Sequence, residues 1–117
     1  MKLMTKTQLI KKVLQKLKVL EMGETPDSDQ TATVGDEYDA AYQELKNDEV
    51  VTWTAAGEIP TLQATQMVIF VASRLVDEFS VPELRAQRLI QQGSIAQDRL
   101  YELNSVPYES TEEPVSY

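Results

Sequence analysis

The chain of 117 residues contains neither cysteine nor histidine. Without cysteine there is no disulfide and no thiolate metal ligand, and the composition fits a reducing cytosol. Without histidine there is no imidazole base, no serine–histidine relay and none of the usual zinc sites. We therefore expect a protein that is not an enzyme and that has no catalytic residue, no bound metal and no cofactor.

Glycine is also scarce, and because its four residues are isolated the chain has no glycine-rich loop that cradles a phosphate. The segment from Asp27 resembles the start of a calcium-binding loop, but Ala32 stands where that loop turns on glycine and Tyr38 where it needs a bidentate glutamate. A solvated helix N-cap is the better interpretation. Adjacent acids such as Asp77 and Glu78 point in different directions on a helix, so solvation explains them better than acid–base catalysis.

Long apolar runs are missing too. The longest, from Met67 to Ala72, is far shorter than the roughly 20 residues of a membrane span. The basic N-terminal segment has lysines between its apolar residues and no small-residue cleavage site after them, so it does not read as a signal peptide. We expect a soluble protein with no membrane contact.

What the chain does have is a sharp division of charge. The first twenty residues hold six lysines and no acid, whereas residues 21–49 hold ten acids and the single base Lys46. The net charge is −8, and since only the first segment offers a basic patch, general nucleic-acid binding is not expected. The opposite charges attract either within one molecule or across a subunit boundary, where they would orient a head-to-tail assembly.

Hydrophobic periodicity predicts the first two helices of a single domain. The first covers about residues 5–22, with a capping box from Thr5 and Gln8 and an end at Gly23. The second starts between residues 28 and 36, with Asp27 or Ser28 as N-cap. The stripes predicted to face the core are Ile10, Val13, Leu14, Leu17 and Leu20 in the first helix, and Val34, Tyr38, Ala41, Tyr42 and Leu45 in the second.

The pattern then changes to a β-rich run, Val50 to Thr54, and a turn-forming segment, which predicts a small hairpin or an extended excursion. The most apolar segment, Thr61 to Phe79, predicts a central helix. A fourth helix follows, with Ser80 as N-cap and Pro82 in its first turn. Its predicted inward stripe is Ala86, Leu89, Ile90, Gly93, Ala96, Leu100 and Leu103.

The predicted fold class is therefore mainly α. Residues 1–103 form a four-helix bundle-like domain, with a short β-hairpin or extended insert between helices 2 and 3. Residues 104–117 contain two prolines and lack periodicity, so they are predicted to form an extended C-terminal arm.

Some residues suit contact with other proteins, although each has a plainer explanation. Trp53 either packs over the hydrophobic core or anchors the chain to a partner protein. Leu84 and Ile95 fall on the face of the fourth helix away from the core, where they are scattered surface residues or a subunit contact. The tail is disordered or a segment that binds a partner by strand addition or in a groove. Its apolar and aromatic positions are Val106, Pro107, Tyr108, Pro114, Val115 and Tyr117.

The order and spacing of these elements is similar to that of a known family. The features that carry the similarity are the run from Lys16 to Pro26, a second helix with Tyr42 and Leu45, an extended insert with Trp53, the pair Ile59 and Pro60, and a long apolar helix ending near Phe79. Over about residues 5–103, the layout resembles the head-to-tail adaptor proteins of tailed bacteriophages, which are also called connector or tail accessory proteins.

The resemblance implies a structural protein of the virion, located at the head–tail junction and made in the host cytoplasm. Members of this family commonly assemble as a ring of about twelve copies beneath the portal. The implied partners are further copies of the chain, the portal protein, tail or nozzle proteins, and passing DNA without sequence-specific contact. An arm that reaches the portal or neighbouring subunits is typical of the family, and residues 104–117 fill that place.

For such an assembly we expect Lys12 and Lys16 of one subunit to meet acids such as Glu37 and Glu44 of the next. An acidic ring also suits a DNA conduit, because carboxylates repel phosphates during ejection. Two other classes remain open. A small acidic regulatory module would bind one partner through Trp53 and the tail, and a carboxylate-only or metal-dependent enzyme would need a pocket that gathers several acids.

Overall fold

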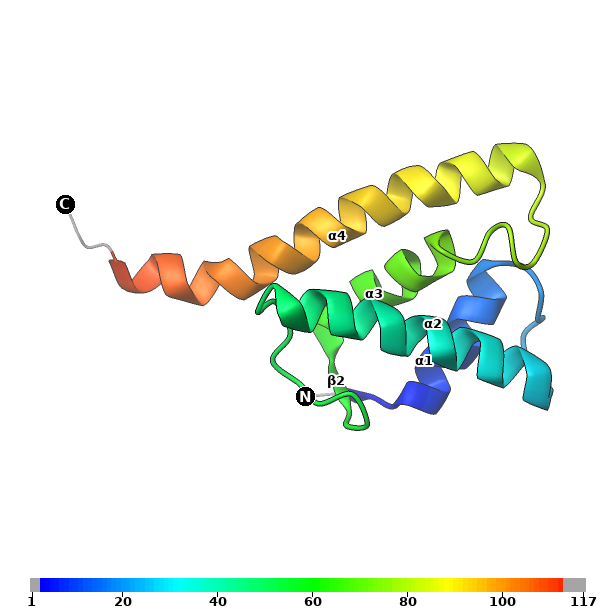
Figure 1. Cartoon of the computed structure of the whole chain (residues 1–117), viewed down its shortest axis with the longest axis horizontal. Helices are drawn as coiled ribbons and strands as arrows, with labels where there is room; N and C mark the ends of the chain where they lie inside the picture. Colours follow the sequence, from blue (N-terminus) through cyan, green and yellow to red (C-terminus); the bar gives the residue numbers. More distant parts are fainter. Residues whose placement is uncertain (1–2, 113–117) are drawn as a thin grey trace.

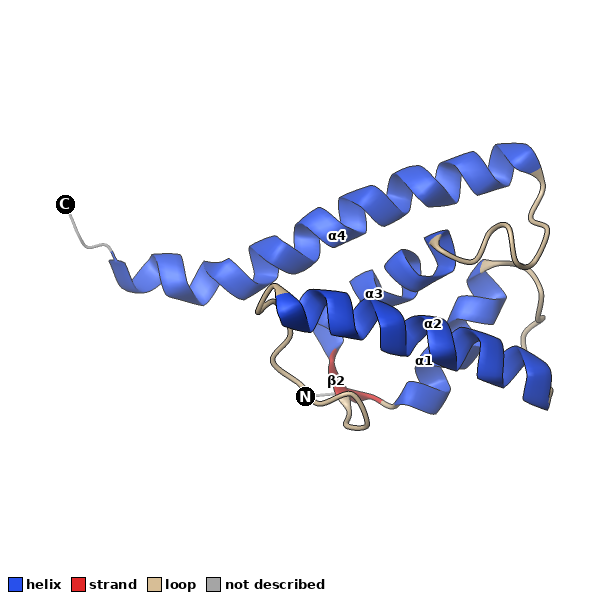
Figure 2. Ribbon diagram, in the orientation of Figure 1, coloured by secondary structure: helices blue, strands red, loops and turns tan. Residues whose placement is uncertain are grey.

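The structure is a computed structural model that describes the backbone of residues 3–112 and the side chains of residues 3–103. Four helices and two short strands follow one another along the chain (Figures 1 and 2). In order they are β1 (Leu3–Met4), α1 (Lys6–Lys16), α2 (Ser28–Asn47), β2 (Ile59–Pro60), α3 (Thr61–Ser73) and α4 (Glu83–Glu112). The predicted mainly helical architecture is confirmed.

Helix α1 begins as predicted but ends earlier. The Thr5 hydroxyl accepts from the Gln8 amide at 3.1 Å and the Gln8 side chain accepts from the Thr5 amide at 3.0 Å, which completes the capping box. The predicted end near Gly23 is wrong, because Lys18 takes a left-handed conformation (φ 63°) and stops the helix after Lys16. Leu20 lies in the loop that follows α1, and its side chain is still buried in the core. The apolar spacing therefore continues past the point where the helix ends.

Helix α2 begins at the earliest predicted position, with Asp27 as its N-cap. Asp27 accepts from the Gln30 amide at 2.7 Å, and the Gln30 side chain accepts from the Asp27 amide at 3.0 Å. This second capping box supports a first half that contains Gly35 and several β-branched residues. The whole predicted stripe of α2 is buried: Val34, Tyr38, Ala41, Tyr42 and Leu45.

The two capping boxes give a direct stability prediction. We expect Thr5→Ala and Asp27→Ala each to lower the free energy of unfolding by about 1 kcal/mol, because each leaves an amide in the first turn of a helix without its acceptor. Urea denaturation followed by circular dichroism measures the change. Ser28→Ala is the control, since Ser28 is exposed and its side chain makes none of the cap bonds. Equal stability of Asp27→Ala and Ser28→Ala would contradict the assignment.

The insert between α2 and α3 wraps a tryptophan against α2. Trp53 donates its indole N–H to the Tyr38 hydroxyl at 2.9 Å, and the Tyr42 hydroxyl donates to the Trp53 carbonyl oxygen at 2.6 Å. Burial raises the pKa of Tyr38, and the bond from Trp53 partly opposes that rise. Strand β2 pairs antiparallel with β1, with Leu3 opposite Pro60 and Met4 opposite Ile59. The strand of the insert therefore pairs with the N-terminus rather than forming a hairpin within the insert.

Helix α3 is shorter than predicted. It ends at Ser73 rather than near Phe79, and turns carry the chain on to residue 80. Leu75 and Val76 remain buried in these turns, which explains why the apolar pattern looked longer than the helix. The prediction that Ser80 is the N-cap of the fourth helix is wrong, because Ser80 has φ 52° and closes the preceding turn, while α4 starts at Glu83.

Helix α4 continues beyond the predicted boundary of the domain. The chain was predicted to be extended from residue 104, whereas the backbone of residues 104–112 continues α4. Extending an existing helix costs little, since its nucleation is already complete. Figure 1 shows this end of α4 projecting past the rest of the molecule. The predicted inward stripe of α4 is buried or half-buried except for Ile90, which is 52% exposed on the flank of the helix.

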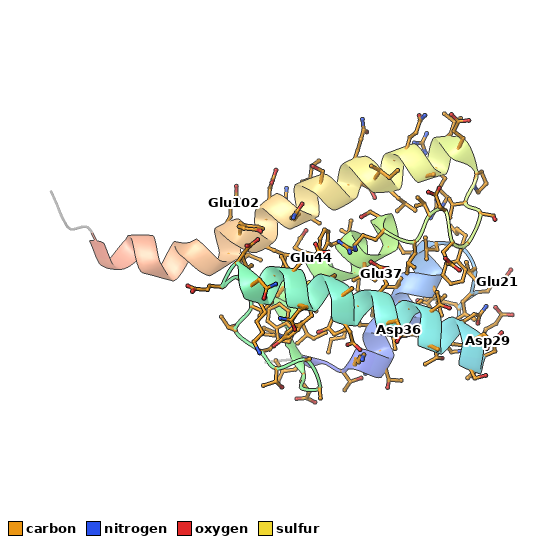
Figure 3. All side chains as sticks on the ribbon, viewed as in Figure 1. Glu21, Asp29, Asp36, Glu37, Glu44 and Glu102 are labelled. Atoms are coloured by element: carbon orange, nitrogen blue, oxygen red, sulfur yellow. The ribbon has the colours of Figure 1, made fainter. Side chains whose placement is uncertain are left out.

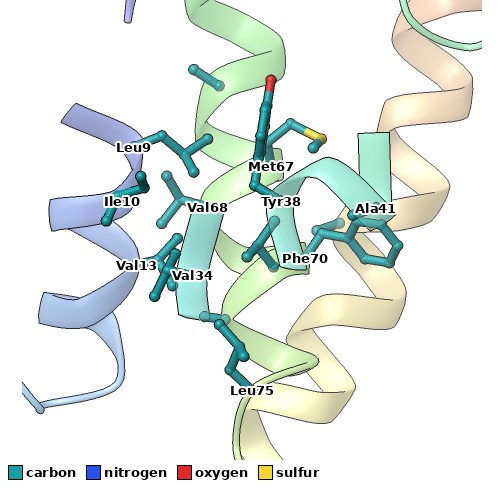
Figure 4. Packing of buried hydrophobic residues seen from close by; sticks show 14 of the residues in the cluster. Leu9, Ile10, Val13, Val34, Tyr38, Ala41, Met67, Val68, Phe70 and Leu75 are labelled. Carbon is teal, nitrogen blue, oxygen red and sulfur yellow. The ribbon is translucent and has the colours of Figure 1, made fainter. Parts of the chain in front are cut away.

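The core is built around α3, as predicted. Helices α1, α2 and α4 all pack on α3, and α1 also packs on α2. Figure 4 shows α1 and α4 on either side of α3, with Tyr38 of α2 beside Met67. The contact of α3 with α4 is close at one point, where a Cβ atom on Gly93 would lie 2.1 Å from the Ser73 hydroxyl oxygen. A side chain at residue 93 therefore has no room.

Candidate interaction surfaces

Arg74 ties the end of α3 to the acidic helix α2. Its guanidinium donates to Glu37 at 2.5 Å and makes two bonds to Glu44, at 2.8 and 3.0 Å. The hydrogen bonds with Glu44 are the largest cause of a raised pKa at Arg74, partial burial opposes it, and Glu37 adds to the rise. Two of the acids predicted to meet a neighbouring subunit are therefore engaged within their own molecule.

Arg74 was not among the residues predicted to have a role. Its signal was present, because it is the only basic residue between Lys46 and Arg85 and it follows directly on an apolar helix. A lone cation in such a place is a candidate partner for acids elsewhere in the chain. Its partners lie 30 and 37 residues away, so the sequence pattern alone did not identify them.

The opposite charges of the first two helices attract within the molecule at one point only among the described residues. Lys6 of α1 donates to Asp39 of α2 at 2.8 Å. Within residues 3–103, no ion pair engages the two lysines predicted to contact a neighbour, Lys12 and Lys16. The intramolecular interpretation of the charge division thus holds for Lys6 and Asp39 but leaves the rest of the α1 lysines available.

Lys12 and Lys16 lie along a groove between α1 and α3. They line a hollow of about 270 Å³ together with Thr65 and Ile69 of α3. Lys12 also borders a second hollow of about 580 Å³, which the exposed Met22 helps to line. We call this surface the lysine groove, defined by Lys12, Lys16, Thr65 and Ile69. It combines a basic edge with an apolar floor.

Leu84 and Ile95 are both exposed, at 74% and 54%. Eleven residues apart, they lie about 20° from each other around α4, so the structure brings them to one face of that helix. Ile95 also borders a hollow with Leu62 and Gln66 of α3. These two predicted contact residues are free of core packing, but they lie on a different element from the lysine groove.

Trp53 belongs to the core, being only 8% exposed. Of the two interpretations left open by the sequence, core cover is the one that the structure supports. The predicted tail residues Val106, Pro107 and Tyr108 fall on the backbone of α4, beyond the described side chains. Pro114, Val115 and Tyr117 lie outside the described residues altogether.

A further link joins α4 to the end of α2. The Tyr101 hydroxyl donates to the carboxylate of Asp48, and this hydrogen bond raises the pKa of Tyr101. At the other end, Arg85 donates to the carbonyl oxygen of Lys16 at 2.6 Å. Hydrogen bonds therefore hold the segment of α4 that packs on α3 near both of its ends, and residues 104–112 form the projecting part of the helix.

In the part of the chain that the structure describes, no three acidic side chains gather closely enough to hold a metal ion. Among the same residues, no helix is both long and apolar enough to cross a membrane. Comparison of the chain with protein-family models, with curated protein sequences and with solved structures found no match.

Proposed function

We propose that this chain is a structural virion protein, a head-to-tail adaptor that assembles as a ring beneath a phage portal and links the capsid to the tail. The observation that carries the proposal is the projecting end of α4. Residues 104–112 extend past the body of the molecule (Figure 1), where they are available to another protein.

The charge of the chain is compatible with a place on the DNA path. The net charge is −8, and acids line the exposed side of α2 and the neighbouring segments (Figure 3). A conduit of this charge would repel phosphates and would not retain DNA during ejection. Sequence order and spacing similar to the adaptor family, a projecting helix and an acidic surface thus favour the same function.

Truncation after Leu103 tests the role of the projecting segment. Residues 104–112 project past the body of the molecule, so the shortened protein should remain folded. We expect it to keep its thermal unfolding midpoint within a few degrees and to lose binding to portal complexes by at least a hundredfold. Circular dichroism measures the first quantity, and pull-down with purified portal rings followed by negative-stain electron microscopy measures the second.

A matched control keeps the length of the tail while removing its chemistry. In this variant a glycine–serine linker of equal length replaces residues 104–117, and it should bind the portal as poorly as the truncated chain. Portal binding by either variant at wild-type strength would remove the tail from the mechanism. A full-length protein that forms only a stable complex of one copy with one partner, and no ring, would favour the regulatory module instead.

A further inference from the structure

We infer that adjoining copies associate by inserting the acidic outer ridge of α2 of one copy into the lysine groove of the next. This inference rests on the proposed ring assembly and assigns its subunit contact. The ridge is defined by Asp29 and Asp36. These acids, rather than the predicted Glu37 and Glu44, meet the lysines of the next copy, because Arg74 already engages Glu37 and Glu44 within the molecule.

The ridge is the part of α2 that faces directly away from its own core. Asp29 precedes the buried Tyr38 by nine residues and Asp36 precedes the buried Leu45 by nine, which in each case is about 180° around the helix. Both acids are exposed, and within residues 3–103 neither takes part in an ion pair. Figure 3 shows Asp29 and Asp36 along the near side of α2.

The lysine groove lies on the other side of the molecule. Arg74 marks the side of α3 that faces α2, because it bonds to Glu37 and Glu44. Thr65 stands nine residues before Arg74, about 180° around α3, and is exposed beside Lys12 and Lys16. The basic groove and the acidic ridge therefore face in opposite directions.

Opposite placement decides the kind of contact. A copy that uses its groove to receive a neighbour still presents its ridge to a third copy, so the association is head-to-tail and closes into a ring when its rotation permits. The charges indicate that the lysine groove is occupied by a second copy of the chain. Copies with a net charge of −8 repel one another at long range, and the α1 lysines are the basic patch that can offset this repulsion at a contact.

Charge reversal on each surface tests the contact. The groove variant is Lys12→Glu with Lys16→Glu, and the ridge variant is Asp29→Lys with Asp36→Lys. Each places like charges across the interface, so each alone should weaken self-association by about tenfold or more. Mixed in equal amounts, the two variants should assemble again, since the lysine ridge of one fits the acidic groove of the other. A chain with all four changes should assemble by itself.

Sedimentation velocity and electron microscopy measure the assembly, with and without purified portal. The control is Asp77→Lys with Glu78→Lys, which changes net charge as the ridge variant does but at exposed positions between α3 and α4. It should assemble like the wild type. Asp29 lies in the first turn of α2, where the helix dipole makes a negative charge stabilising, so replacing Asp29 also affects the stability of the helix. Asp36→Lys alone therefore serves as a second ridge variant.

Three results separate the possible failures. Wild-type rings that persist in both the groove and the ridge variants would overturn this contact while leaving the proposed function intact. Loss of assembly in the groove variant alone would indicate that the groove contacts a surface other than the ridge and would also overturn the proposal. A wild-type chain that stays monomeric both alone and with the portal would remove the ring, and with it both proposals.

Discussion

Trp53→Ala is expected to lower the free energy of unfolding by about 3–5 kcal/mol. The substitution removes a large buried ring and also the indole N–H that bonds to the Tyr38 hydroxyl. Tyr38 is itself fully buried, so its hydroxyl would lose a partner where water does not readily replace it. Domains of this size are stable by about 5–15 kcal/mol, so the loss is a large part of the total.

Chemical denaturation of the variant measures this effect, and two controls separate its parts. Tyr42→Phe keeps all the rings and removes only the bond to the Trp53 carbonyl oxygen, so it should cost about 1 kcal/mol. Leu62→Ala removes an exposed apolar side chain and should change stability by less than about 0.5 kcal/mol. If Trp53→Ala proves as stable as Leu62→Ala while losing a binding partner, the tryptophan is an anchor and its place in the core is wrong.

Gly93→Ala is expected to destabilise the protein by about 1–3 kcal/mol. In most helix interiors the same change is favourable, because alanine restricts the unfolded chain and glycine does not. At this position the new methyl group would lie 2.1 Å from the Ser73 hydroxyl oxygen and 2.3 Å from the Ser73 Cβ atom. Helices α3 and α4 would have to separate, and the close packing along their length would loosen.

A double-mutant cycle isolates the contact. Ser73→Gly removes both atoms that the new methyl group would meet, so the pair Gly93→Ala with Ser73→Gly should recover much of the loss, with a coupling of about 0.5–3 kcal/mol. Gly35→Ala is the matched control. A Cβ atom there would meet Ile10 at 3.6 Å and Lys6 at 3.9 Å, both ordinary contacts, so the change should raise stability by about 0.5–1 kcal/mol. Additive effects at residues 93 and 73, measured by urea denaturation, would show that the two helices do not approach so closely.

The candidate surfaces were only partly predictable. The division of charge indicated an attraction between the lysines of α1 and the acids of α2, which the structure shows within the molecule for Lys6 and Asp39. A role of Lys12 and Lys16 in contact between subunits stays a prediction. The division of charge did not indicate which acids are free. Arg74 engages Glu37 and Glu44 across 37 and 30 residues of sequence, and no local pattern encodes a pairing at that separation.

The boundaries of the helices were also only partly predictable from the sequence. The start of α1 was predicted from its capping box, whose partners are three residues apart. The start of α2 was predicted only to within residues 28–36, with Asp27 or Ser28 as N-cap, and the structure selects Asp27 through a capping box with Gln30. The ends of α1 and α3 were not predictable. After α1 the chain turns through the left-handed Lys18, which is not glycine and carries no recognisable stop signal. After α3, residues 74–80 continue in turns and contain neither glycine nor proline. The apolar residues that follow reach the core from turns and mimic a longer helix.

The helical class, the number of helices, most of the residues that face the core and the cap of α1 were predictable from the sequence alone, because each depends on residues no more than a few turns apart. The pairing of β2 with β1, the engagement of Glu37 and Glu44 by Arg74, and the opposite placement of the acidic ridge and the lysine groove follow from the packing of the helices. These outcomes depend on distances between segments far apart in the chain. Such distances are set only when the helices pack around α3.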